Sequence, residues 1–189
     1  MKTQINIAIR ITIATTILFG LIYPLTVTAL SQLLFSAQSN GSLVTINNEV
    51  RGSHLLAQPF SDPRYFHPRP SSAGTGYDAS QSSGSNLAPT NHQLPDRITT
   101  AATQLRAENP TTPIPIDLLT ASGSGLDPDV TPAAAQFQIP RIAQARHIPE
   151  STLRTLIDQH TQPRQLGFLG EPRINVLELN QSLDAKFPQ

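Results

Sequence analysis

"ITIATTILFGLIYPLTVTALSQLLF", Ile11 to Phe35, decides the architecture of this chain, because it runs for 25 residues without a charged side chain. An α-helix rises about 1.5 Å per residue, so about 20 apolar residues cross the hydrocarbon core of a bilayer. The next charged residue along the chain is Glu49. Pro24 lies inside the stretch, where we expect it to kink the helix. The sequence therefore predicts one transmembrane helix over residues 11–35.

The residues that flank this helix predict its orientation. Lys2 and Arg10 precede the apolar run, and positively charged flanks stay on the cytoplasmic side. We therefore expect residues 1–10 in the cytoplasm and residues 36–189 on the extracytoplasmic side of the plasma (inner) membrane. The protein would then be a single-pass membrane protein.

A cleaved secretory signal peptide is the alternative interpretation of the same stretch. Val27-Thr28-Ala29 has the small residues of a cleavage site, and cleavage there would release a freestanding domain. However, the apolar pattern continues through Leu30 to Phe35, which is too long for a signal core. The length therefore favours a retained helix.

Composition excludes several classes of function. The 189 residues carry 13 basic and 13 acidic side chains, so net charge does not attract nucleic acid. Cysteine is absent, which excludes disulfides, cysteine–metal sites and cysteine nucleophiles. Proline (17) outnumbers glycine (10), which is typical of rigid loops on a modest core. The length leaves room for one domain after the membrane segment.

Short helix and strand patterns alternate after residue 36, which predicts an α+β domain. Residues 42–46 and 53–58 are expected to be short strands on either side of a turn at Asn47-Asn48, and "RINVLEL" (173–179) has the apolar density of a third strand. A first helical pattern ends at Asn109-Pro110 and has on one face Leu94, Ile98, Ala101, Ala102 and Leu105. A second begins at Thr131-Pro132 and is interrupted by Pro140. A third begins at Pro149 and directs inward Leu153, Leu156 and Ile157.

The segment from Pro59 to Asn91 has no helix or strand pattern. Loops of this length are usually functional or disordered, and the polar tract 71–85 alone resembles a disordered linker. The segment nevertheless holds four of the seven aromatic residues beyond Phe35, namely Phe60, Tyr65, Phe66 and Tyr77. Aromatic side chains anchor ordered loops, so we expect an ordered segment.

"ASGSGLDPDVTPAAA" (Ala121–Ala135) holds the candidates for a catalytic serine, a phosphate-binding loop or a cation site. Ser124 lies between two glycines, but the nucleophile elbow of serine hydrolases needs glycines two positions away on each side. A phosphate-binding loop needs a lysine, and none lies between Lys2 and Lys186. The two aspartates beside Pro128 lack the ligand spacing of a calcium loop. An extracytoplasmic hydrolase that uses Ser124 stays the alternative function, and no metal site is predicted.

The same stretch is better interpreted as a rigid turn. Glycines permit positive φ and prolines fix φ, so the backbone holds one shape. Because Leu126 is almost its only apolar side chain, we expect the turn to contribute little to the core and to dock on a partner subunit. On this hypothesis Leu126→Ser leaves the stability of the domain nearly unchanged. The predicted docking residues are Gly123, Gly125, Leu126, Asp127 and Pro128. The alternative is a purely structural turn that starts the next helix.

Three blocks of sequence, in this order, resemble a known family. They are "RYFHPRPSS" with "GYD" and "SGSNLAPTN", then "TASGSGLDPDVTPAAAQFQIPRIAQAR", and finally "LGFLGEPRINVLELNQSLD". Together they are similar to the C subunit of Kdp-type potassium-transporting P-type ATPases. The resemblance implies a small, single-span, non-catalytic accessory subunit of a complex that imports potassium. The implied partners are a pump subunit with the phosphorylated aspartate, a channel-like subunit and a very small hydrophobic subunit.

The resemblance also implies a role in ATP binding. Members of the family have been described as catalytic chaperones that help the pump subunit to bind ATP through a glutamine, and Gln138 (or Gln136) matches that position. ATP and Mg²⁺ would be used by the complex, and this chain would hold no cofactor of its own. The predicted orientation places Gln138 outside, away from ATP, so a helix-surface or core-edge amide is the competing interpretation.

Overall fold

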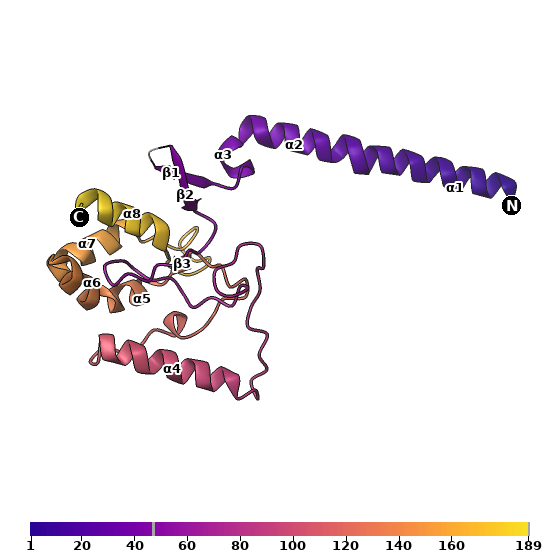
Figure 1. Ribbon diagram of the computed structural model, residues 1–189. Coiled ribbons are helices and arrows are strands. Elements are labelled where there is room, and N and C mark those ends of the chain that lie inside the picture. The colour runs from indigo at the N-terminus through magenta and orange to yellow at the C-terminus, as the bar shows by residue number, and fades with distance from the viewer. Residues whose placement is uncertain (47, 189) are drawn as a thin grey trace. The chain divides into compact units, whose positions relative to one another are not determined.

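The computed structural model describes residues 1–46 and 48–188 and divides into two units, Met1–Leu43 and Val44–Gln189. Most of the first unit is one continuous helix, Lys2–Leu34, made of α1 (Lys2–Thr15), a π-helical segment (Thr16–Ile22) and α2 (Tyr23–Leu34) (Figure 1). Its 33 residues are long and apolar enough to cross a membrane. A long apolar helix in this region is therefore confirmed, although it begins at Lys2 and includes the charged N-terminal residues. Its crossing of a membrane over residues 11–35 stays a prediction.

Pro24 sits in the first turn of α2, directly after the π-helical segment. A proline removes one backbone donor and crowds the preceding turn, and a π-helical turn accommodates both effects without breaking the helix. Pro24 is thus accommodated by a π-helical segment directly before it, and a kink at this position stays a prediction. A short helix, α3 (Ser36–Ser39), follows Phe35.

Four helices surround the core of the second unit: α5 (Pro132–Phe137), α6 (Ile139–Arg146), α7 (Glu150–His160) and α8 (Val176–Lys186). Two small sheets accompany them. Strand β1 (Leu43–Ile46) pairs with β2 (Glu49–Ser53), and β3 (Asp129–Val130) pairs antiparallel with β4 (Ile174–Asn175) (Figure 1). This mixture of helix and strand confirms the α+β class.

The helix starts agree with the sequence signals. The Thr131 hydroxyl accepts a hydrogen bond from Ala134 N at 3.2 Å, and Pro132 follows in the first turn of α5. The pattern is split ahead of Pro140, as predicted: α5 ends at Phe137, Gln138 lies at the junction, and Pro140 lies in the first turn of α6. Leu153, Leu156 and Ile157 of α7 are buried. Capping and proline positions therefore set the boundaries of these helices.

Helix α4 (Gln93–Glu108) also follows its pattern, and a 3₁₀ turn (Ile116–Leu118) lies between it and β3. The half-buried positions of α4 are the five that the apolar pattern predicted, and the rest of the helix is exposed. Helix α4 therefore packs against the domain through one narrow stripe of apolar side chains.

Two predicted strands are wrong. Only Ile174–Asn175 of the segment 173–179 is a strand, because Asn175 caps a helix by accepting a hydrogen bond from Glu178 N at 3.2 Å. An asparagine followed three positions later by glutamate is a helix-start signal that outweighs local apolar density. The second N-terminal strand is Glu49–Ser53, not 53–58. Of the predicted turn between them, Asn48 has φ 65°, and Asn47 lies outside the described residues.

The segment 59–91 contains no helix or strand, yet it is held in place by its aromatic residues. Phe66 is fully buried in the core, and its backbone N–H and carbonyl bond to the side-chain amide of Asn180 at 2.8 and 2.9 Å. The Tyr65 hydroxyl donates to Asp184 at 2.9 Å, and the Tyr77 hydroxyl donates to the Arg69 carbonyl at 2.8 Å. The segment is ordered, as its aromatic content predicted.

Candidate functional site

Gln138, the residue that the resemblance links to ATP, is buried with 2% of its surface exposed. Its carbonyl oxygen accepts hydrogen bonds from His67 N and Arg141 Nη2, both at 2.7 Å. Its amide nitrogen donates to the carbonyls of His67 (3.1 Å) and Ala134 (3.3 Å). A glutamine amide has two donors and two acceptor sites, so all four are used within the protein. Gln138 therefore joins the α5–α6 junction to the 59–91 segment, whereas Gln136 is exposed.

Arg141 extends this network from the next turn of α6. Its guanidinium donates to the carbonyls of Pro63 (2.6 Å) and Tyr65 (3.0 Å) and pairs with Glu108 at 3.0 Å. Burial lowers the pKa of Arg141, and the Glu108 carboxylate opposes that change. The arginine stays cationic at neutral pH because its pKa starts so high. The hydrogen-bond donors of Arg141 are thus engaged by backbone carbonyls and a carboxylate of the same chain.

Arg146, at the end of α6, also binds the 59–91 segment. Its side chain is 3% exposed, donates to the Arg64 carbonyl at 2.8 Å, and pairs with Asp184 at 2.6 Å. The guanidinium also lies 4.7 Å from the centroid of the Tyr65 ring, a cation–π geometry. The sequence pattern did not indicate either arginine as a site residue. Their spacing of five residues on one short helix was the only available signal.

His67 lies between these groups and is half-buried. Its Nε2 is 3.0 Å from the Asp62 carbonyl. Burial lowers the pKa of His67, and the positive charge of Arg141 lowers it further, so the imidazole is neutral at pH 7. The pKa of Asp62 is lowered to about 2 by hydrogen bonds from Arg64. The pKa shifts of His67 and Asp62 therefore arise from burial and from contacts that hold residues 62–67 in place.

The predicted docking turn, residues 121–132, packs against the 59–91 segment. Gly125 is buried with φ 69°, and a Cβ there would lie 2.5 Å from the Ser83 carbonyl oxygen and 2.7 Å from Ala73 N. Ser71 Oγ donates to the Gly125 carbonyl at 2.7 Å, and Ser83 N donates to the Ser124 carbonyl at 2.9 Å. The turn is therefore rigid, as predicted, but its contacts are within the domain.

The other four docking candidates differ in exposure. Leu126 is 4% exposed and its carbonyl accepts from Ala57 N at 2.9 Å. Asp127 pairs with Arg69 at 3.0 Å, and the Pro128 carbonyl accepts from Val176 N at 3.0 Å. Gly123 alone among these candidates is exposed. Docking by this turn stays a prediction, but the premise that Leu126 contributes little to the core is wrong.

Three aspartates line a cavity of about 300 Å³ beside this turn: Asp117, Asp127 and Asp129. Two are paired with arginines, since Asp127 contacts Arg69 and Asp129 contacts Arg173 at 3.1 Å. Burial raises the pKa of Asp129, and Arg173 opposes that change. Among the described residues, no group of three histidine, cysteine, aspartate or glutamate side chains has the arrangement of a metal site.

Ser124 does not sit in a catalytic arrangement within the described chain. Its hydroxyl accepts from Leu126 N at 3.1 Å and lies 3.4 Å from the Ser122 hydroxyl. Two histidines are engaged elsewhere, His54 with Glu178 and His67 with the Asp62 carbonyl. A serine nucleophile needs a base within hydrogen-bonding reach. The geometry therefore gives the hydrolase alternative no support.

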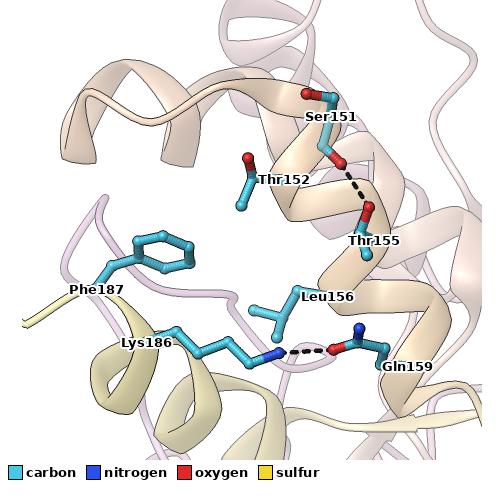
Figure 2. Close-up of a pocket in the computed structure, with 7 residues that line it drawn as sticks. All are labelled: Ser151, Thr152, Thr155, Leu156, Gln159, Lys186 and Phe187. Carbon is cyan, nitrogen blue, oxygen red and sulfur yellow. Dashed lines mark hydrogen bonds between the residues drawn. The ribbon is translucent and has the colours of Figure 1, made fainter.

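A further cavity of about 250 Å³ lies between α7 and the end of α8 (Figure 2). Three of its polar side chains bond within the chain: Lys186 Nζ donates to Gln159 Oε1 at 2.6 Å, and Thr155 Oγ1 donates to the Ser151 carbonyl at 3.0 Å. Leu156 and Phe187 supply its apolar surface. With one cation and no carboxylate in its lining, it does not form an acid–base pair.

Comparison with known proteins identifies the family. The model of the family described as "KdpC: K+-transporting ATPase, c chain" matches residues 5–185. The potassium-transporting ATPase KdpC subunit of Koribacter versatilis is 50% identical over 188 residues, which cover 100% of this chain and 97% of that protein. The subunit of Caulobacter vibrioides is 55% identical over 174 residues (92% and 88%), and that of Acidobacterium capsulatum is 53% identical over 183 residues (96% and 97%). The resemblance carried by the three sequence blocks is confirmed, and the chain belongs to the KdpC family, the c chains of K+-transporting ATPases.

Proposed function

We propose that this chain is a non-catalytic, membrane-anchored accessory subunit of an ATP-driven potassium import complex, and that it stabilises the assembly of the other subunits. The observation that carries the proposal is the family match over residues 5–185, which includes both the apolar helix and the domain. The proposed partners are the pump subunit, the channel-like subunit and the small hydrophobic subunit. ATP and Mg²⁺ act in those partners.

The proposed topology follows the charge of the N-terminus. Lys2 and Arg10 keep residues 1–10 in the cytoplasm, residues 11–35 cross the inner membrane, and residues 36–189 form the extracytoplasmic domain. Intact-mass measurement of the membrane-extracted protein tests retention of the helix. A chain that begins near Leu30 would mean signal cleavage instead.

A non-catalytic role agrees with the way the domain uses its polar side chains. Gln138, Arg141 and Arg146 bond to backbone carbonyls and carboxylates of the same chain. Ser124 has no base beside it in the described residues. These groups hold the fold, and this supports a role that depends on surface shape.

Purification in mild detergent by a C-terminal tag tests the proposal directly. We expect the pump and channel-like subunits to copurify, and cells that lack this chain to yield a complex of those subunits that dissociates or has lost ATP-driven potassium uptake. Copurification of neither subunit would reject the accessory role.

Assistance in ATP binding through Gln138 is a separate prediction from the family resemblance. Calorimetric titration of the full chain in detergent with ATP and Mg²⁺ measures it. We expect no tight binding, because the amide of Gln138 already has four partners. Micromolar binding that is lost in Gln138→Ala and kept in Gln136→Ala would establish the nucleotide role.

A further inference from the structure

A cavity of about 520 Å³ lies where the β1–β2 hairpin, residues 58–65 and α8 meet, and we call it the α8 cavity. Its apolar surface comes from Ile46 of β1, Phe60, the ring of Tyr65 and Leu177 of α8. Small-molecule sites have volumes of about 300–1,000 Å³, mostly apolar walls and a few polar groups at defined positions. The α8 cavity has these properties, and its polar groups determine which ligand fits.

Two aromatic side chains line the α8 cavity together. The ring centroids of Phe60 and Tyr65 are 5.6 Å apart, and the ring planes are tilted by 42°. Both side chains are half-buried, and Phe60 packs against the hydrophobic core. Ile46 is 40% exposed. A ligand with an apolar group would cover the apolar surface that these three side chains expose in the cavity, which favours binding.

The charged groups of the α8 cavity are already paired within the chain. Asp184 pairs with Arg146 at 2.6 Å and accepts a hydrogen bond from the Tyr65 hydroxyl at 2.9 Å. Arg51 pairs with Glu49 at 2.8 Å. A charged ligand that enters an apolar cavity loses its hydration and needs an opposite charge there. Because both charged groups of the lining already have a partner, the cavity favours a neutral ligand.

Two glutamine amides at the α8 cavity have a buried atom without a hydrogen-bond partner among the described residues. The two atoms are Nε2 of Gln181, a donor, and Oε1 of Gln58, an acceptor. The other amide of the lining, Asn180, is engaged at both ends by the backbone of Phe66. The Gln181 side chain is only half-buried, so rotation about its χ angles can direct its amide toward a ligand. An amide group of a ligand supplies both missing partners, since its carbonyl accepts and its N–H donates.

We propose that the α8 cavity binds a neutral small molecule that joins an apolar group to an amide. The apolar group contacts Ile46, Phe60 and the ring of Tyr65. The carbonyl of the ligand accepts a hydrogen bond from Gln181, and its N–H donates to Gln58. All lining residues belong to the Val44–Gln189 unit, so the site is built by this chain alone and does not depend on the proposed function.

The extent of the lining favours a small molecule over a segment of another protein. Ten residues line the α8 cavity. A stable protein interface takes about 20–30 residues from each side, whereas a small-molecule site holds its ligand with far fewer side chains. We therefore expect the lining to bind its ligand without help from a second protein.

A bound ligand should also strengthen the attachment of the 59–91 segment to α8. Tyr65 and Asn180 both line the α8 cavity. The same two side chains join the segment to the helix, since Tyr65 bonds to Asp184 and Asn180 bonds to Phe66. A ligand that contacts both favours the attached state of the segment over a detached one. Binding should therefore protect residues 59–91 from protease.

Binding of N-acetyl-L-phenylalanine amide to the full chain in detergent tests the site. This probe is neutral and joins an aromatic ring to amide groups. Ligand-observed NMR should give a dissociation constant of about 1 mM for the wild-type chain. N-acetyl-L-phenylalanine, which has a carboxylate in place of the terminal amide, is the matched control and should bind at least about fivefold more weakly. No binding at about 20 mM probe, or equal binding of the acid, would overturn the proposal.

Gln181→Leu separates recognition by the amide from a merely structural role. The substitution keeps a similar side-chain volume and removes the unpartnered donor, so the thermal midpoint without probe should stay the same or rise. Binding of the probe should weaken at least about tenfold, and its protection of residues 59–91 should disappear. Gln136→Leu, at an exposed glutamine of α5, is the control and should keep both. Equal binding by Gln181→Leu and the wild-type chain would mean that the probe binds elsewhere and that the site is wrong.

Ile46→Trp distinguishes a small molecule from a segment of a partner. The larger side chain fills part of the α8 cavity from a position that is already exposed. We expect the variant to lose probe binding and to keep the wild-type yield of copurified ATPase subunits. If Ile46→Trp loses those subunits, the cavity holds a segment of a partner and the small-molecule site is wrong.

Discussion

The 121–126 turn and the 164–170 loop share one local feature and have opposite surroundings. Each has a glycine at positive φ with a leucine beside it, Gly125 with Leu126 and Gly167 with Leu166. Leu126 is 4% exposed, however, whereas Leu166 is 83% exposed. A Cβ on Gly125 would lie within 2.7 Å of two backbone atoms, whereas Gly167 has nothing within 4 Å. Composition thus identifies rigid turns, but only the tertiary contacts show which of them is packed inside the domain.

The largest difference between the two turns should appear at their glycines. Gly125→Val combines a β-branched residue at positive φ with an overlap against the Ser83 carbonyl and Ala73 N, so we expect a loss of about 4 kcal/mol in the free energy of unfolding. Gly167→Val meets open space and should lose only about 1–2 kcal/mol. Denaturant unfolding of the full chain in detergent measures both. Equal losses would mean that the two turns are equally constrained.

The leucines give the next largest contrast. Leu126→Ser should lower the free energy of unfolding by about 3 kcal/mol, since it removes a buried side chain and leaves a hydroxyl in its place. Leu166→Ser should change it by less than about 0.5 kcal/mol. The same unfolding experiment applies. A negligible loss for Leu126→Ser would restore the hypothesis that the 121–132 turn serves docking and not the core.

Gln138 tests whether the 59–91 segment is held by the amide network. Gln138→Ala leaves the His67 backbone groups and one Arg141 donor without their partner, and we expect a loss of about 2 kcal/mol. Gln136→Ala, two residues away and exposed, is the control and should be nearly neutral. Limited proteolysis should cut the 59–91 segment faster in Gln138→Ala only. Unchanged proteolysis would show that the arginines suffice.

The smallest effect expected is a pH dependence at His67. Its pKa is lowered in the folded state, so the unfolded chain binds a proton more readily below the ordinary histidine value of 6.5. Stability should therefore fall as the pH drops through 6.5, and His67→Asn should reduce that slope between pH 7.5 and 5. Asp62, with its pKa near 2, does not titrate in this window. A slope that stays the same in His67→Asn would exclude this group as its cause.

Local signals predicted the elements that local chemistry determines. The apolar run, the Thr131-Pro132 helix start, the division at Pro140 and the stripe on α4 follow from residues close together in the chain. The strand assigned to 173–179 failed because apolar density does not distinguish a buried helix from a strand, and the cap at Asn175 decided between them.

The candidate site was less predictable, because its contacts join distant residues. Nothing in the sequence around Gln138 indicates that its partner is His67, 71 residues earlier. The roles of Arg141 and Arg146 depend in the same way on carbonyls of residues 63–65. Rigidity of the 121–132 turn was predictable from glycine and proline, but the face it presents to the domain was not.

The attachment of residues 65 and 66 to α8 has a consequence for the order of folding. Phe66 bonds to Asn180 and Tyr65 bonds to Asp184, more than a hundred residues later. Contacts of such high sequence separation form late and slowly, because a long loop must close first. During synthesis residues 65 and 66 lack their α8 partners until nearly the last residue has emerged, although residues 124–146 can hold other parts of the 59–91 segment earlier. A nascent chain arrested before Asn180 should therefore remain more sensitive to protease around residues 65 and 66 than the complete chain.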